Sequence, residues 1–164
     1  MTESRAPAVA LAALADLVRP RAVRAKLSAA TWEDAVDLAG GALVASGSVE
    51  AGYVPAMKRV LKKLGPYAVL APGAVLLHAR PEDGVREACL GLVTLRWPVD
   101  FGHRDNDPVD LVFSLGAVDH EGHVKALREL AGLLQDEAAL ARIRLAADDA
   151  SLLEAVRSRG RPPQ

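Results

Sequence analysis

The sequence predicts a single-domain α/β sandwich in which a mixed β-sheet is flanked by helices. Three observations predict this fold class. Apolar residues recur at helical spacing near both ends of the chain, short apolar runs lie between these helical segments, and the 164 residues contain no low-complexity linker. The length is typical of one domain, and the content of 51% hydrophobic and 25% charged residues is typical of globular proteins. The pattern does not predict the order of the strands.

The N-terminal residues 1–20 are expected to form a helical arm, because Leu11, Leu14 and Val18 recur at helical spacing. Charged residues flank the alanine-rich run, which favours a short amphipathic helix over a cleaved signal peptide. The apolar stripe could pack on its own domain or on a second copy, so a homo-oligomer stays open. The domain then covers residues 21–158, and residues 159–164 form a flexible tail.

The helices and strands of the domain are predicted from caps, breakers and periodicity. Thr31 and Asp34 form a capping box that opens a helix ending near Ser46-Gly47, and Ser48 is expected to cap a second helix that ends at Gly65-Pro66. The predicted strands are Arg21–Ala29, Tyr67–Leu70, Ala74–Leu77, Leu90–Leu95 and Leu111–Leu115, and the later helices are His120–Leu134, Asp136–Leu145 and Asp148–Val156.

Composition and charge exclude several classes of function. The formal net charge of −1 predicts no general attraction to nucleic acid or to anionic lipid. Cys89 is the single cysteine, which excludes an intrachain disulfide and a cysteine-rich zinc site and is typical of a reducing compartment. No apolar run approaches the roughly 20 residues that span a membrane. We therefore expect a cytoplasmic protein without membrane insertion.

His78 is the first candidate for chemistry. It ends a buried apolar run and begins a polar loop, so a strand fixes its direction while the loop leaves it accessible. An imidazole can accept and release a group near neutral pH, and the guanidinium of Arg80 lies two residues away. The alternative is a loop histidine that only bonds a backbone carbonyl.

His123 is the second candidate. Leu127, Leu130 and Leu134 follow it at plus 4, plus 7 and plus 11, which places His123 on the apolar stripe of its helix, at the N-terminal turn. This stripe is expected to face the ends of the strands. The alternative is a histidine that merely marks the helix boundary. His120 and His123 could also supply half of a zinc site, but no motif provides further ligands.

Several ordered motifs resemble the EIIA proteins of the bacterial sugar phosphotransferase system. They are Tyr53-Val54-Pro55-Ala56-Met57, Gly65-Pro66-Tyr67, Ala71-Pro72-Gly73, His78-Ala79-Arg80-Pro81-Glu82-Asp83-Gly84, Asn106-Asp107-Pro108-Val109 and the segment that ends at His123. The resemblance is to the mannitol/fructose-type EIIA superfamily, and within it to the ascorbate-specific branch. It covers nearly the whole chain and implies that residues 21–158 form an EIIA type-2 domain.

The resemblance implies a phosphocarrier. His78 would accept a phosphoryl group from phospho-HPr, forming tele-phosphohistidine, and pass it to a cysteine of a separate EIIB subunit, for ascorbate or a related sugar. His123 would donate to the phosphoryl oxygens, Arg80 would add positive charge, and neither a metal nor an organic cofactor is implied. Two alternatives are a regulatory EIIA-like protein that acts by binding another protein, and a metal-dependent hydrolase that uses the histidines.

Two positions depart from the family pattern. Leu77 stands where the family usually has proline before the active histidine, so the loop is expected to hold His78 less firmly. Val60 stands where mannitol-type members carry a supporting arginine.

Overall fold

The computed structural model describes residues 14–158. Its strands are β1 (Val18–Leu27), β2 (Val69–Ala71), β3 (Ala74–His78), β4 (Cys89–Val99) and β5 (Val109–Gly116), and its helices are α2 (Trp32–Ala45), α3 (Tyr53–Leu64), α4 (His120–Leu134), α5 (Glu137–Leu145) and α6 (Asp149–Arg157). Two 3₁₀ turns, η1 (Gly65–Ala68) and η2 (Pro81–Asp83), complete the list.

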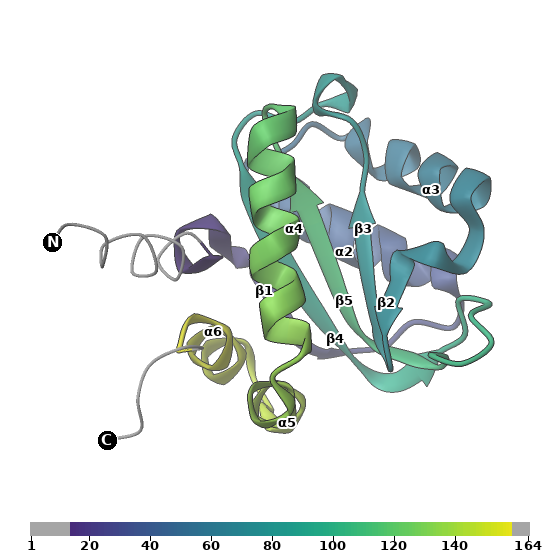
Figure 1. Cartoon of the computed structure of the whole chain (residues 1–164), viewed down its shortest axis with the longest axis vertical. Helices are drawn as coiled ribbons and strands as arrows, with labels where there is room; N and C mark the ends of the chain where they lie inside the picture. Colours follow the sequence, from purple (N-terminus) through teal and green to yellow (C-terminus); the bar gives the residue numbers. More distant parts are fainter. Residues whose placement is uncertain (1–13, 159–164) are drawn as a thin grey trace, which may run out of the picture.

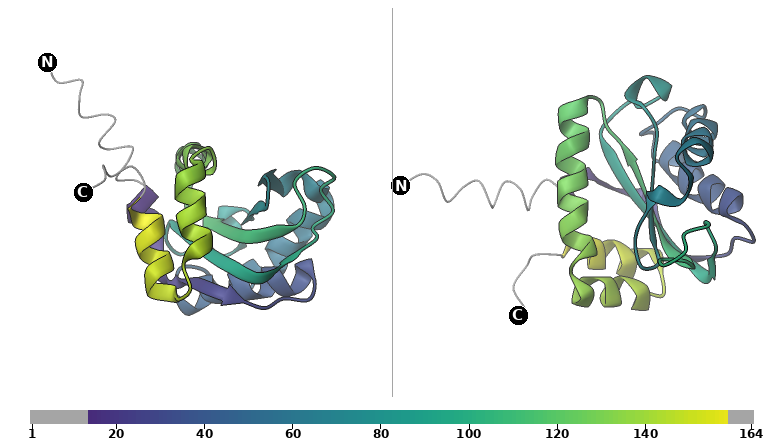
Figure 2. Two further views of the ribbon diagram at one scale, coloured as in Figure 1. Left: turned by 90° about the horizontal axis from the view of Figure 1, so that it is seen from below. Right: turned by 45° about the vertical axis from the view of Figure 1, so that its right-hand side comes forward.

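The five strands form one mixed sheet in the order β1-β4-β5-β3-β2. The β1/β4 and β3/β5 pairs are parallel, whereas β4/β5 and β2/β3 are antiparallel. Helices cover both faces of the sheet, with α2 and α3 on one side and α4 on the other (Figures 1 and 2). The predicted single-domain α/β sandwich with a mixed sheet is confirmed.

Alternation along β3 divides the core into two layers. Val75 and Leu77 pack in the cluster that includes α2 and α3, whereas Ala74 and Leu76 pack in the cluster that includes α4, α5 and α6. Because successive side chains of a strand point to opposite faces, a central strand that is apolar throughout must be covered on both sides. His78 is the first residue of β3 that is not fully buried.

The beginning of the chain differs from its prediction. Residues 14–17 are helical, but β1 already begins at Val18, so Pro20 lies in a strand and not at the end of a helix. Val18 pairs with Leu90 of β4. Because β1 is an edge strand with a neighbour on one side only, it tolerates a proline, which has no backbone N–H to donate. Leu14 and Val18 are buried in the domain's own core, while Leu11 and the tail 159–164 lie outside the described residues.

Two further local predictions are wrong. The strand predicted at Tyr67–Leu70 begins two residues later: Tyr67 and Ala68 belong to η1, which has Pro66 in its first turn, and β2 covers Val69–Ala71. Ser48 does not cap α3, which begins after Gly52 without a side-chain cap. The hydroxyl of Ser48 is instead 2.8 Å from that of Ser46 in the buried interior. The Thr31 cap is confirmed, since its hydroxyl accepts from the N–H of Asp34.

Candidate functional site

His78 lies at the C-terminal end of β3, where it pairs with Leu115 of the parallel neighbour β5. The preceding residue, Leu77, is fully buried and is held by pairing with Ser114 in the same ladder. The strand therefore fixes the backbone before His78 although no proline precedes it. The Nδ1 atom of His78 is buried and has no hydrogen-bond partner among the described residues, so Nε2 is the ring nitrogen left to face a reactant.

The loop that follows His78 is held by a tyrosine of α3. The hydroxyl of Tyr53 accepts a hydrogen bond from the N–H of Ala79 at 2.9 Å and donates one to the carbonyl of Leu115 at 2.7 Å. Burial raises the pKa of Tyr53 to about 12, so the hydroxyl keeps its proton for the Leu115 carbonyl. The sequence placed Tyr53 in a family motif but assigned its hydroxyl no partner, because a single sequence gives no sign of which carbonyl the hydroxyl reaches.

His123 approaches His78 from α4, which covers the face of the sheet opposite α3. It lies in the first turn of α4, whose N-cap Asp119 accepts from the N–H of Gly122 at 2.7 Å. The centroids of the His78 and His123 rings are 5.2 Å apart, with 44° between the ring planes. The structure thus brings together the two histidines that the sequence singled out, from elements 45 residues apart.

Burial favours the neutral form of both imidazoles. Burial lowers the pKa of His78, and the nearby His123 lowers it further, while the backbone carbonyl of Leu76 acts weakly in the opposite direction. Burial also lowers the pKa of His123, with a second contribution from His120. A neutral imidazole has a free lone pair, so at pH 7 His78 is available as a nucleophile.

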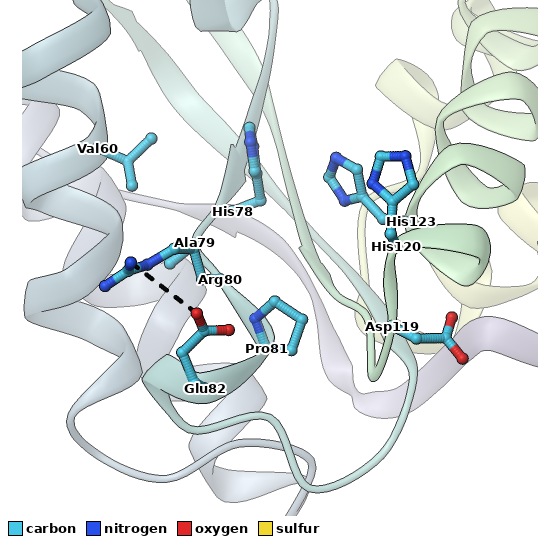
Figure 3. Close-up of a pocket in the computed structure, with 9 residues that line it drawn as sticks. All are labelled: Val60, His78, Ala79, Arg80, Pro81, Glu82, Asp119, His120 and His123. Atoms are coloured by element: carbon cyan, nitrogen blue, oxygen red, sulfur yellow. Dashed lines mark ion pairs between the residues drawn. The ribbon is translucent and has the colours of Figure 1, made fainter.

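A cleft of about 510 Å³ opens in front of the two rings (Figure 3). Its lining residues come from α3, from the end of β3 with the loop after it, and from the start of α4: Val60, His78, Ala79, Arg80, Pro81, Glu82, Asp119, His120 and His123. An apolar pocket of about 180 Å³ adjoins it and shares Val60, His78 and His123 with it. The site is therefore an open cleft with a mainly apolar side pocket.

Arg80 lines the cleft, but its guanidinium is engaged with acidic neighbours. It lies 3.9 Å from Glu82 Oε2 and 3.5 Å from Asp83 Oδ2, and Figure 3 shows it on the side of His78 away from His123. The side chain is 72% exposed, so these ion pairs are weak and can exchange for another anion.

Two other side chains with potential chemistry, those of His103 and Cys89, do not line the cleft. His103 lies in the loop between β4 and β5, where Nδ1 accepts from the N–H groups of Asp105 and Asn106. Cys89 is buried, and burial raises the pKa of its thiol to about 11, so it is a packing residue. Within residues 14–158, no group of three or more His, Cys, Asp or Glu side chains is arranged to hold a metal ion.

Residues 16–158 match the model of the family described as "Phosphoenolpyruvate-dependent sugar phosphotransferase system, EIIA 2". The chain belongs to this family. It is 37% identical over 141 residues to an ascorbate-specific phosphotransferase system EIIA component of Shigella boydii, which covers 85% of this chain and 92% of that relative. The expected family and its phosphotransferase activity are thereby confirmed for this EIIA protein.

Solved structures agree with this assignment. The mannitol-specific cryptic phosphotransferase enzyme IIA CmtB of Escherichia coli is 30% identical, with a TM-score of 0.76 over 88% of this EIIA chain and 97% of that one. A second structure is the complex of enzyme IIAMTL with phosphorylated enzyme IIBMTL of Escherichia coli, at 28% identity and a TM-score of 0.73, covering 85% and 96% of the two chains. In the described part of this EIIA protein, no helix is long and apolar enough to span a bilayer.

Proposed function

We propose that this EIIA protein carries a phosphoryl group on Nε2 of His78, accepted from phospho-HPr in the cytoplasm and passed to a cysteine of a separate EIIB subunit. The observation that carries the proposal is the His78–His123 pair at the bottom of an open cleft, with rings 5.2 Å apart and with Nδ1 of His78 buried. This arrangement leaves one nitrogen lone pair exposed to an incoming phosphorus atom.

The transfer requires positioning more than covalent assistance. The lone pair of His78 Nε2 forms the new N–P bond while the N–P bond of the donor breaks, and its electron pair stays on the donor nitrogen. The proton that the other ring nitrogen of His78 releases balances the proton that the donor imidazole takes up. In the onward step, a cysteine thiolate forms the S–P bond, the electron pair of the N–P bond returns to Nε2 of His78, and the ring takes back the proton that it had released.

His123 is the group best placed to stabilise the charge that develops. Its ring faces His78 across the cleft, and an imidazole N–H can donate to a phosphoryl oxygen. Arg80 supports this role electrostatically, since an incoming phosphoryl group can replace the exposed contacts of its guanidinium with Glu82 and Asp83.

The partner proteins would dock on the apolar rim of the cleft, which we define as Leu64, Tyr67 and Leu70. All three are large, line the adjoining apolar pocket and are 48%, 79% and 49% exposed, respectively. Exposed apolar side chains gathered beside a reactive residue are typical of protein-binding surfaces. The names of the relatives favour ascorbate, or a related sugar, as the substrate of the transport system that EIIB serves.

The test is the intact mass of the protein after incubation with phosphoenolpyruvate, enzyme I and HPr. We expect one acid-labile phosphoryl group on the wild type and on His103→Ala, and none on His78→Ala. His103→Ala is the matched control because it removes the same side chain outside the cleft. An unphosphorylated wild type beside fully charged HPr would overturn the proposal, and phosphate retained by His78→Ala would move the site to another residue.

A matched pair of acceptors tests the sugar assignment. The phosphorylated protein is mixed with EIIB from an ascorbate system and with EIIB from a mannitol system. We expect transfer to the first to be faster by at least about tenfold, which corresponds to 1.4 kcal/mol of discrimination at the docking surface. Equal or reversed rates would contradict the ascorbate assignment without affecting the role of His78.

A further inference from the structure

A third imidazole, that of His120, lines the same cleft and has no part in the transfer proposed above. His120 is the first residue of α4, three positions before His123, so the two side chains leave the same face of the helix. Figure 3 shows their rings side by side, on the side of α4 that faces His78. His120 is exposed to solvent, whereas His78 and His123 are partly buried.

The fixed charges of the cleft do not balance a phosphoryl group. Arg80 is the only lysine or arginine among the described residues that line it, and its guanidinium already contacts two carboxylates. The Asp119 carboxylate accepts from the N–H of Gly122, and so it turns back on its own helix. Phosphorylation adds a charge of about −2, which leaves an unbalanced anion between β3 and α4.

The titratable and charged groups around His120 come from three elements. They are His78 of β3, Arg80 and Glu82 in and before η2, and Asp119, Glu121, His123, Lys125, Arg128 and Glu129 of α4. Of these, His123 is electrostatically coupled to His120, which contributes to lowering the pKa of His123. A positive charge on His120 therefore contributes to the electrostatic potential at the site where the phosphoryl group would lie.

The exposed imidazole of His120 is suited to compensate the negative charge that a phosphoryl group brings to the cleft. A positive charge on the exposed ring of His120 keeps its hydration, whereas burial lowers the pKa of His78 and of His123 and so opposes the charged form of each. Val60, which forms the wall on the α3 side, is aliphatic and supplies no charge. His120 is thus the residue of the cleft that can become a cation when an anion arrives.

We propose that His120 takes up a proton when His78 is phosphorylated and, as a cation at the mouth of the cleft, positions the phosphoryl group for transfer. The inference rests on the proposed function of His78. The proton comes from solvent and returns to it when the phosphoryl group leaves, and His120 forms no bond to phosphorus. It is a positioning residue that acts through charge.

The experiment measures single-turnover transfer from phospho-HPr to the protein between pH 6 and 8, for the wild type, His120→Gln and His120→Lys. We expect His120→Gln to lower the first-order transfer constant by about threefold to tenfold at pH 6.5, the scale of one exposed charge, and to flatten the pH profile. His120→Lys should restore the rate and keep it constant over this range. His103→Gln, the same change outside the cleft, should behave as wild type.

A second readout follows the proton directly. The imidazole ¹⁵N shifts of His120 should show a larger protonated fraction in the phosphorylated protein than in the free protein at pH 7, whereas those of His103 should not change. A merely structural role of His120 would not produce this difference.

Four outcomes would overturn the inference: a His120→Gln variant with wild-type rate and pH profile, a His120→Lys variant as slow as His120→Gln, unchanged His120 shifts, or a change in KM for phospho-HPr alone. The last would assign His120 to docking. In each case phosphate would still be found on His78, whereas failure of the proposed function itself would leave the wild type unphosphorylated.

Discussion

The buried hydroxyl of Tyr53 lies 2.9 Å from the backbone nitrogen of Ala79, the residue that follows His78. The same hydroxyl donates to the carbonyl of Leu115, the residue that pairs with His78 in the sheet. One side chain of α3 therefore joins the end of β3 to the end of β5 and fixes the backbone directly after the reactive imidazole. This bridge holds the start of the loop that follows His78.

Replacing Tyr53 by phenylalanine tests this bridge. We expect a loss of about 1–3 kcal/mol of unfolding free energy, because the Ala79 N–H and the Leu115 carbonyl stay buried without their partner. Transfer to His78 should slow by about tenfold, because a displaced imidazole loses its alignment with phosphorus. Urea unfolding and single-turnover transfer measure the two effects.

Tyr67→Phe is the matched control for Tyr53→Phe. It deletes the same hydroxyl from a side chain that is 79% exposed, so its stability should stay within about 0.5 kcal/mol of the wild type. A Tyr53→Phe variant as stable and as fast as this control would show that the bridge has no role.

Replacing His123 by alanine should leave His78 able to accept phosphate but slow the onward transfer to EIIB by about 10²–10³-fold, the usual cost of losing one oriented donor. Intact mass checks the first expectation, and rapid-quench transfer to EIIB checks the second. Onward transfer at the wild-type rate would remove His123 from the mechanism.

The stability of the fold should depend on the protonation of the two facing histidines. Burial lowers the pKa of both His78 and His123 below 6.5, so between the folded and unfolded values the unfolded chain binds more protons. Their contribution to stability is therefore complete above about pH 6.5 and is lost as the pH falls below it. Urea unfolding at pH 7.5 and pH 5 measures this loss.

A double variant isolates that contribution from the carboxylates, which also titrate on the acidic side. With both His78 and His123 changed to glutamine, the difference in unfolding free energy between pH 7.5 and pH 5 should shrink, while the same change at His103 should leave it as in the wild type. An equal difference in all three proteins would contradict the assignment.

Introducing a charge into the apolar rim should weaken docking without altering His78. We expect Tyr67→Glu to raise KM for phospho-HPr by about tenfold or more, because a partner's apolar surface would have to desolvate the carboxylate. The control is Trp97→Glu, since Trp97 is 67% exposed but lies in the C-terminal part of β4, which is remote from His78. An equal effect of the two changes would show that the rim is not the docking surface.

The sequence determined the fold class and the two principal site residues because these depend on local signals. Runs such as Ala74–Leu77 are apolar throughout, which requires a strand covered on both faces, and the leucines after His123 place that histidine on the inner stripe of its helix. The cap at Thr31 was likewise predicted from residues three positions apart, because both partners lie in one turn.

Local signals failed where a distant partner decides the conformation. Ser48 has the chemistry of a helix cap, but burial beside Ser46 engages its hydroxyl, and the edge position of β1 allows Pro20 in a strand. The 5.2 Å approach of His78 and His123 and the engagement of Arg80 by Glu82 and Asp83 also depend on the assembled fold. So does the bridge from Tyr53 to Ala79 and Leu115.

By itself, the sequence determined which side chains could do chemistry in this protein and the elements from which they project. The tertiary structure alone decided which ring nitrogen of His78 is accessible, which hydroxyl holds its loop and which imidazoles share its cleft. The physical reason is that spacing along the chain fixes only the direction of a side chain, whereas burial, hydrogen bonding and the local electric field depend on atoms that arrive from remote segments.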